Sequence, residues 1–248
     1  MGERCSWCGV DSLYVDYHDH EWGLPERDSR ALYEKLVLDG FQAGLSWYTI
    51  LRKRENFRAA FAGFDPDAIA TWGEPDVVRL LGDAGIVRHR GKIEGAILNA
   101  RAWQQVEADV GFSHFIWSAV DGVAVQHRLT AESQVPATDP IGDALAKRLK
   151  HAGFKFCGPT IVYAFAQAVG LVNDHIIGCP AHDRVAMAGI QPGDKAPDGL
   201  DKLDQPVGVP DELPMTLPEP VAALPGPVAA LPEPVEGSPE RPSDVVMR

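Results

Sequence analysis

Proline is unevenly distributed along the 248-residue chain, and this limits where a packed domain can form. Residues 191–248 hold 13 of the 20 prolines, contain no aromatic residue, and repeat the similar segments LPEPVAA, LPGPVAA and LPEPVEG. Such a segment has little apolar surface to offset the entropy of ordering its backbone, and it favours extended polyproline II conformations. We therefore expect a folded domain over residues 1–188 and a disordered acidic tail over residues 189–248.

The remaining residues show apolar positions at helical spacing. Asp28 and Ser29 form a capping pair for a helix ending near Gly40, and Ser46 begins a second helix that runs to Phe61. Further helices are expected after Pro66 and Pro75, from Arg90 to Glu107, from Ser113, from about Leu145 to Gly153, and from Pro159 to Gly170. Only a weak alternation at residues 123–125 suggests a strand, so the sequence predicts an all-α domain of about eight helices. The first two dozen residues lack periodicity and are expected to be irregular.

The charge of the chain gives no support to nucleic-acid binding by bulk attraction. The formal net charge is −12, of which the folded part, with 24 acidic and 19 basic residues in 1–190, carries about −5. A duplex partner favours a basic surface, so DNA binding would depend on local clusters. Three such clusters occur, at residues 52–54, 88–92 and 147–155, and each is equally consistent with a solvated helix face.

Four cysteines, no hydrophobic signal segment and no apolar run of membrane-spanning length favour a soluble cytoplasmic protein that does not enter the membrane. In that compartment, clustered Cys and His indicate metal binding or chemistry more often than disulfides. Cys5 and His18 near the start, and His175 and Cys179 near residue 180, supply two thiols and two imidazoles. The H-x3-C spacing suits metal ligands, and Cys8 could replace His18 in a Cys3His site.

The stretch LDGFQAGLSW, residues 38–47, interrupts the helical pattern with an acid and two glycines. A carboxylate at Asp39 and an indole at Trp47, on a turn between two helices, would suit a small pocket for a flat ligand. A helix C-cap at Gly40, an N-cap at Ser46 and a core Trp47 explain the same pattern without a ligand.

Residues 153–158, GFKFCG, join two helices and contain glycines at both ends. Gly153 and Gly158 would let the backbone approach a phosphate, with Lys155 in the turn, and Pro159 opens a helix whose N-terminal N–H groups point at an anion. A purely structural hairpin is the alternative.

LDGFQAGLSW also closely resembles the signature of type I 3-methyladenine DNA glycosylases, of the helix-hairpin-helix superfamily. The resemblance recurs in CSWCG and YHDHEWGLP near the start, in AGIVRHRGKIEGAILNAR, and in GFKFCGPTIVYAFAQAVGLVNDHIIGC, so that it covers about residues 3 to 182. It implies a structural zinc ion held by the four residues Cys5, His18, His175 and Cys179. Closed coordination by four protein ligands would make this Zn²⁺ a structural element and not a catalyst.

The resemblance further implies a base excision repair enzyme that acts on double-stranded alkylated DNA, and we expect it to act as a monomer. Trp47 and Tyr17 would stack on a flipped base, and Asp39 would accept hydrogen bonds from its edge. Tyr14 and Trp22 supply further aromatic faces for the cationic 3-methyladenine. Leu45 would wedge into the gap in the duplex, beside Gln42.

The acid differs from the family pattern, where it is Glu, because Asp is shorter by one methylene. Asp174, beside His175, is a second candidate for the catalytic carboxylate. No motif positions a lysine as an imine-forming nucleophile, which predicts a monofunctional hydrolase that leaves an abasic site. Two alternatives remain: a lesion-binding protein that has lost turnover through the Asp39 change, and a zinc-stapled interaction module that uses its proline-rich tail.

Overall fold

The computed structural model describes residues 3–189, and the predicted tail lies outside this range. Ten α-helices and two very short strands occur in these residues. The helices are α1 (Ser12–His20), α2 (Ser29–Gln42), α3 (Trp47–Ala60), α4 (Pro66–Ala70), α5 (Glu74–Gly82), α6 (Arg90–Asp109), α7 (Phe112–Trp117), α8 (Pro140–His151), α9 (Pro159–Ala168) and α10 (Pro180–Ala188). The predominantly helical class predicted from the sequence is confirmed.

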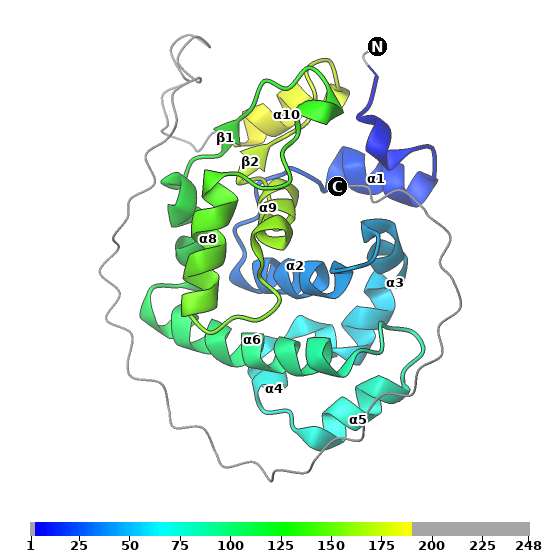
Figure 1. Ribbon diagram of the computed structural model, residues 1–248, viewed down its shortest axis with the longest axis vertical. Coiled ribbons are helices and arrows are strands. Elements are labelled where there is room, and N and C mark those ends of the chain that lie inside the picture. Colours follow the sequence, from blue (N-terminus) through cyan, green and yellow to red (C-terminus); the bar gives the residue numbers. More distant parts are fainter. Residues whose placement is uncertain (1–2, 190–248) are drawn as a thin grey trace, which may run out of the picture. The chain divides into compact units, whose positions relative to one another are not determined.

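Helix α2 is the element on which the others assemble, and it packs against α3, α6, α7 and α9 (Figure 1). The side chain of Asp28 caps its first turn by accepting hydrogen bonds from the backbone N–H groups of Arg30 (3.0 Å) and Ala31 (2.8 Å). Unlike an ordinary surface helix, α2 is buried on most sides from Leu32 to Phe41, including the acid Asp39. This burial places Leu38, Asp39, Gly40 and Phe41, the first part of the LDGFQAGLSW stretch, in the core of the domain.

The 20-residue helix α6 crosses below α2 in the view of Figure 1 and also carries α4 and α5. It binds α2 through the Tyr33 hydroxyl, which donates to the Ala96 carbonyl at 3.0 Å. The Asn99 side chain of α6 holds the α8–α9 hairpin: its amide donates to the Lys155 carbonyl at 3.1 Å, and its oxygen accepts from the Lys155 N–H at 2.7 Å. The hairpin is therefore anchored in the middle of the domain by its backbone.

Phe156 in this hairpin packs against helices α2 and α6 where they lack side chains. A Cβ at Gly95 would lie 2.7–2.8 Å from the Phe156 ring, and one at Gly40 would lie 3.2 Å from its Cβ. Phe156 also adopts φ of 56°, a conformation that non-glycine residues seldom adopt. These two glycines are thus required for close packing of the hairpin.

Two expectations about elements were wrong, and a third was confirmed in part. The first two dozen residues contain a regular helix, α1, which begins at the cap residue Asp11, whose carboxylate accepts from the N–H of Leu13 at 3.0 Å. Ser113 lies inside α7, which begins after Gly111. The weak alternation at 123–125 corresponds to strand β1 (Val125–Gln126), which pairs in parallel with β2 (Val172–Asn173), a partner distant in sequence.

Candidate active site and metal centre

The exposed turn between α2 and α3 is stabilised by hydrogen bonds from a lysine of α6. Lys92 is buried and donates from Nζ to the carbonyls of Phe41 (2.9 Å) and Ala43 (2.6 Å), which end α2 without helical partners. Gly44 follows with φ of +79°, and the Ser46 hydroxyl accepts from the Thr49 N–H to begin α3. Leu45, 44% exposed, projects from this turn beside the partly exposed Gln42.

A recess of about 300 Å³ lies against α1, α2 and α3. Its aromatic wall is formed by Tyr17 of α1 and Trp47 of α3, whose ring centroids are 5.4 Å apart with an interplanar angle of 44°. The residues that line it are Tyr17, His20, Glu21, Leu24, Pro25, Glu26, Ala31, Glu34, Lys35, Leu38, Trp47, Arg54, Arg58, Ala168 and Val169. It is large enough for a flat heterocycle and carries aromatic faces on which one could stack.

Asp39 lies next to this recess, 1% exposed, on the turn of α2 that follows Lys35. Its Oδ1 accepts a hydrogen bond from the Lys35 ammonium, while its Oδ2 is buried with no partner among the described residues. Burial raises the pKa of the Asp39 carboxyl, and the charge of Lys35 opposes this rise. The indole N–H of Trp47 is likewise buried without an acceptor, so one acceptor and one donor are left for a ligand.

Lys35 also contacts the indole of Trp47, with Nζ 3.8 Å from the ring centroid. This lysine was not predicted from the sequence, although its position four residues before Asp39 places both side chains on one face of α2. Lys92 was placed in the basic cluster at residues 88–92, but it is buried. Its contact with the turn was not predicted, because its partners lie about 50 residues earlier in the chain.

Tyr14 and Trp22 do not line the recess. The Tyr14 ring packs against Trp7 at 5.1 Å and Tyr48 at 5.4 Å, while Trp22 packs edge-on against His175 at 4.5 Å between centroids. Both belong to the aromatic packing around the N-terminal segment. Their base-binding roles stay predictions, and only Tyr17 and Trp47 are brought together near Asp39.

Asp174 is buried and fully engaged by its neighbours. Its oxygens accept from the His127 ring (2.6 Å), the Tyr163 hydroxyl (2.7 Å) and the Gln167 amide (2.7 Å). Burial raises the pKa of the Asp174 carboxyl, but these hydrogen bonds outweigh it and lower the pKa below its usual value. With both oxygens occupied, Asp174 suits a structural role that ties the β2 loop to α9.

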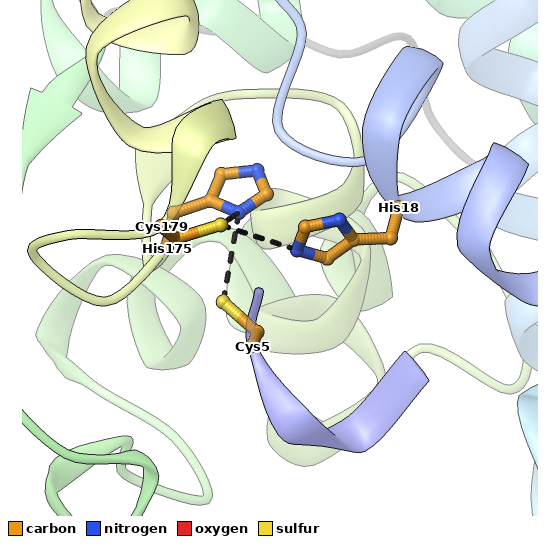
Figure 2. A group of neighbouring side chains, drawn as sticks. All are labelled: Cys5, His18, His175 and Cys179. Carbon is orange, nitrogen blue, oxygen red and sulfur yellow. Dashed lines mark hydrogen bonds between the residues drawn. The ribbon is translucent and has the colours of Figure 1, made fainter. Parts of the chain in front are cut away.

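The predicted metal ligands converge at one point, shown in Figure 2. Cys5, His18, His175 and Cys179 are all buried, and their ligand atoms lie within 4.8 Å of one another. Cys179 Sγ is 3.6 Å from His18 Nε2 and 3.7 Å from His175 Nδ1, and Cys5 Sγ is 3.7 Å from His175 Nδ1. A tetrahedral ion with Zn–S near 2.3 Å and Zn–N near 2.0 Å requires ligand separations of about 3.5 Å, so the donor set fits Zn²⁺.

Neighbouring groups orient both imidazoles toward this point. His18 Nδ1 lies 2.8 Å from an Asp19 carboxylate oxygen, and His175 Nε2 lies 3.1 Å from the Trp22 carbonyl oxygen. Each contact favours a proton on the outer nitrogen and leaves a lone pair on the inner one. Cys8 instead directs its thiol at the Cys5 carbonyl, 3.1 Å away, and is not part of the cluster.

The hairpin presents Lys155 at the surface between Gly153, with φ of +95°, and Gly158, which precedes the first turn of α9. A Cβ at Gly158 would meet no atom within 4 Å, so its backbone is open on one side. The hairpin and the Leu45 turn are both connected to α6, through Asn99 and Lys92. Among the described residues, no helix has the length and hydrophobicity needed to cross a membrane.

The fold places the chain among the helical DNA glycosylases. A crystal structure of a 3-methyladenine DNA glycosylase I matches it with a TM-score of 0.72 and 55% identity, covering 73% of this chain and all of the other. A structure of the Staphylococcus aureus enzyme, which addresses 3-methyladenine recognition, matches with a TM-score of 0.70 and 39% identity over 72% of this chain and 95% of the other.

Sequence comparisons define the family. A sequence model of the methyladenine glycosylase family matches residues 7–182. The Escherichia coli DNA-3-methyladenine glycosylase 1 is 53% identical over 178 residues, which cover 71% of this chain and 95% of that protein. The Haemophilus influenzae DNA-3-methyladenine glycosylase is 46% identical over 181 residues, covering 73% and 98%. The chain belongs to the methyladenine glycosylase family.

Proposed function

We propose that this protein excises 3-methyladenine from alkylated double-stranded DNA by hydrolysing the N-glycosidic bond. The observation that carries the proposal is the buried Asp39 oxygen without a partner, beside the recess that Tyr17 and Trp47 line. A glycosylase must hold its target base outside the stack, between aromatic faces and polar groups that match its edge. The relatives named DNA-3-methyladenine glycosylase support this substrate.

In this proposal the base stacks on Trp47 and Tyr17, and Asp39 Oδ2 accepts a hydrogen bond from its exocyclic amino group. The shorter Asp side chain is compensated in part by its burial, since a buried unpaired acceptor strongly favours a ligand that donates to it. The exposed Leu45 enters the gap in the duplex, with Gln42 beside it, and Lys92 keeps their turn in place.

We propose that the hairpin fixes the position of the DNA by contacting its backbone. The open backbone at Gly158 and the exposed Lys155 suit a phosphate, and such contacts set register without reading sequence. Because Asn99 and Lys92 both belong to α6, one helix would hold the phosphate contact and the wedge at a fixed separation.

Chemistry at the recess requires little acid catalysis, because the methylated base already carries a positive charge and leaves as a neutral molecule. Asp39 and the aromatic faces would stabilise the cationic base and the cationic sugar that develops at C1′. Lys35 is paired with Asp39; burial lowers the pKa of the Lys35 ammonium, and the Asp39 carboxylate opposes that fall. We propose a monofunctional mechanism because no motif positions a lysine as an imine-forming nucleophile.

We further propose that Cys5, His18, His175 and Cys179 bind one structural Zn²⁺, on the strength of their separations and their two oriented imidazoles. When bound, the ion would join the N-terminal segment to the loop before α10. Since its substrate is DNA, we also propose that the protein acts in the cytoplasm, as a monomer.

The test is release of free bases from methylated duplex DNA, separated by chromatography. Wild-type protein should release 3-methyladenine, and Asp39→Asn should lower the rate by about a hundredfold, as expected for loss of a charged group that acts in the transition state. Asp109→Asn, at an exposed position at the end of α6, is the matched control and should behave as wild type. DNA binding without any release by wild type would favour the lesion-binding alternative.

Removal of residues 189–248 tests the domain boundary and the interaction-module alternative together. The shortened chain should release 3-methyladenine at an unchanged rate, because all residues of the recess and the cluster lie before residue 180. A chain that keeps its stability but loses its activity would show that the tail takes part in function.

A further inference from the structure

Lys35 occupies the position that a bound base would need. Its ammonium lies 3.8 Å from the centroid of the Trp47 ring and is paired with Asp39. Lys35 and Trp47 both line the recess, whereas Asp39 does not, so the lysine lies between the recess and the carboxylate. Its side chain is 16% exposed, compared with 1% for Asp39.

Trp47 is largely covered by its neighbours. The residue is 8% exposed, and besides Lys35 its ring contacts the ring of Tyr17. A base that stacks on the Trp47 face covered by Lys35 must displace the ammonium from the indole. To reach Asp39 Oδ2 from the recess, the base must also move aside the Lys35 side chain that lies between them.

The other cations of the recess are already paired with acids of their own. Arg54 binds Glu21 through both guanidinium nitrogens, and Arg58 binds Glu34 at 2.7 Å. Lys35 differs from these two arginines, because its partners are the Asp39 carboxylate and the Trp47 ring, the same groups that we propose bind the base.

We propose that Lys35 is a resident cation that competes with the base for Trp47 and Asp39, and that it expels the base after the glycosidic bond has broken. The proposal rests on the function proposed above. Lys35 acts here as a positioning and specificity residue, and it forms no bond with the substrate.

The direction of the competition follows from the charge of the base. Before cleavage the methylated base is a cation. It can therefore take the place of the positively charged ammonium at the indole face and near the carboxylate. As the bond between C1′ and the ring nitrogen breaks, its electron pair moves to the base, which becomes neutral. Water supplies the oxygen to C1′ and its proton goes to solvent. The neutral product no longer matches the charge of Lys35, which is tethered nearby and returns.

Calorimetric titration of free, neutral 3-methyladenine into the full-length protein tests this competition. Lys35→Met removes the competitor and should bind the free base about tenfold more tightly than wild type, the value of a partly desolvated cation–π contact. Lys35→Arg keeps the charge and should bind as wild type does. Lys150→Met, at an exposed position of α8 outside the recess, is the control and should also be unchanged.

Product inhibition supplies a second readout that a merely structural role would not change. Free 3-methyladenine should inhibit base release by Lys35→Met at an about tenfold lower concentration, while Lys35→Arg stays at the wild-type value. Should Lys35→Met fold poorly in thermal melts, Lys35→Gln gives the same loss of charge with a polar side chain.

Weaker or equal binding of the free base by the uncharged variants would overturn the proposal. Weaker binding would mean that Lys35 contributes to base binding, and equal binding would mean that it has no effect on base binding. This failure is distinct from failure of the proposed function. If wild type releases 3-methyladenine but the variants show no tighter binding, only the competition is refuted. If wild type releases no base but the variants bind it more tightly, the competition stands and the enzymatic activity is refuted.

Discussion

Trp47 has two groups that could contact a ligand, its ring face and its indole N–H. The ring is in contact with Lys35 and Tyr17, and Nε1 is buried without an acceptor among the described residues. A flat aromatic ligand could use both, stacking on the face and offering a lone pair to the N–H. The two contributions are separable by substitution.

Trp47→Ala should raise the free energy of base recognition by about 1–3 kcal/mol, the usual cost of removing an aromatic stacking partner from a base. Trp47→Phe should retain most of the stacking and lose only the hydrogen bond, giving an intermediate effect. The measurement is kcat/KM for 3-methyladenine release, with melting temperature as a check on folding. Equal rates for wild type and Trp47→Ala would remove Trp47 from the base-binding site.

Several residues of the candidate site and of the cysteine and histidine cluster could be predicted from the sequence, but most of their contacts could not. Asp39, Trp47 and the four metal-ligand positions could be selected because each stands in a motif with recognisable chemistry. The pairing of Asp39 with Lys35 was accessible from their helical spacing, whereas the Lys92 contact was not, because nothing local indicates where a distant helix will cross.

At the scale of elements, the α8–α9 hairpin depends on a close approach to α6. The Phe156 ring occupies the space where Gly95 has no side chain, and Asn99, one turn further along, fixes the Lys155 backbone. The hairpin is therefore a rigid attachment whose distance from α6 is set by a glycine.

Gly95→Ala should move the hairpin and weaken DNA binding, because the added methyl would lie 2.7–2.8 Å from the Phe156 ring. The expected destabilisation is about 1–3 kcal/mol, typical of overpacking. Gly82→Ala in α5 is the control, since its Cβ would meet no atom within 4 Å. The free energy of unfolding, from denaturant titration, and the affinity for DNA should be measured on both variants. Unchanged DNA affinity in Gly95→Ala would contradict the proposed role of the hairpin in DNA binding.

Helices with strong caps and apolar periodicity were predicted from sequence, among them α2, α3, α6 and α9. The error at α1 has a physical cause: most of the aromatic residues of this segment face packing partners or the cysteine and histidine cluster, so they do not form a simple apolar stripe. The weak alternation at residues 123–125 indicated β1, but β2 and its pairing with β1 were not predicted. A two-residue strand such as β2 leaves no alternation, and it lies almost 50 residues further along the chain.

At the scale of the whole described domain, the cysteine and histidine cluster links its two ends. Cys5 and His18 come from the N-terminal segment, and His175 and Cys179 come from the loop that precedes α10 (Figure 2). Sequence spacing alone left the choice between His18 and Cys8 open, and the geometry of the cluster favours His18.

Cys179→Ser, or treatment with a strong chelator, should release the metal and lower the melting temperature, since the binding free energy of a structural metal is part of the folding free energy. Cys8→Ser is the matched control, because Cys8 is also a buried thiol of this region but lies outside the cluster. Metal content by atomic absorption should be one ion per chain in wild type and Cys8→Ser, and near zero in Cys179→Ser. Full metal content in Cys179→Ser would refute the ligand set.

Tyr17 and His18 are successive residues of one short helix, and they face two different sites. A rotation or slide of α1 that suited one of them would misplace the other. Substitutions that alter the metal cluster are therefore expected to alter the recess as well. A related protein that lacked the cysteine and histidine ligands would need other contacts to hold α1, and with it Tyr17, in place against the recess.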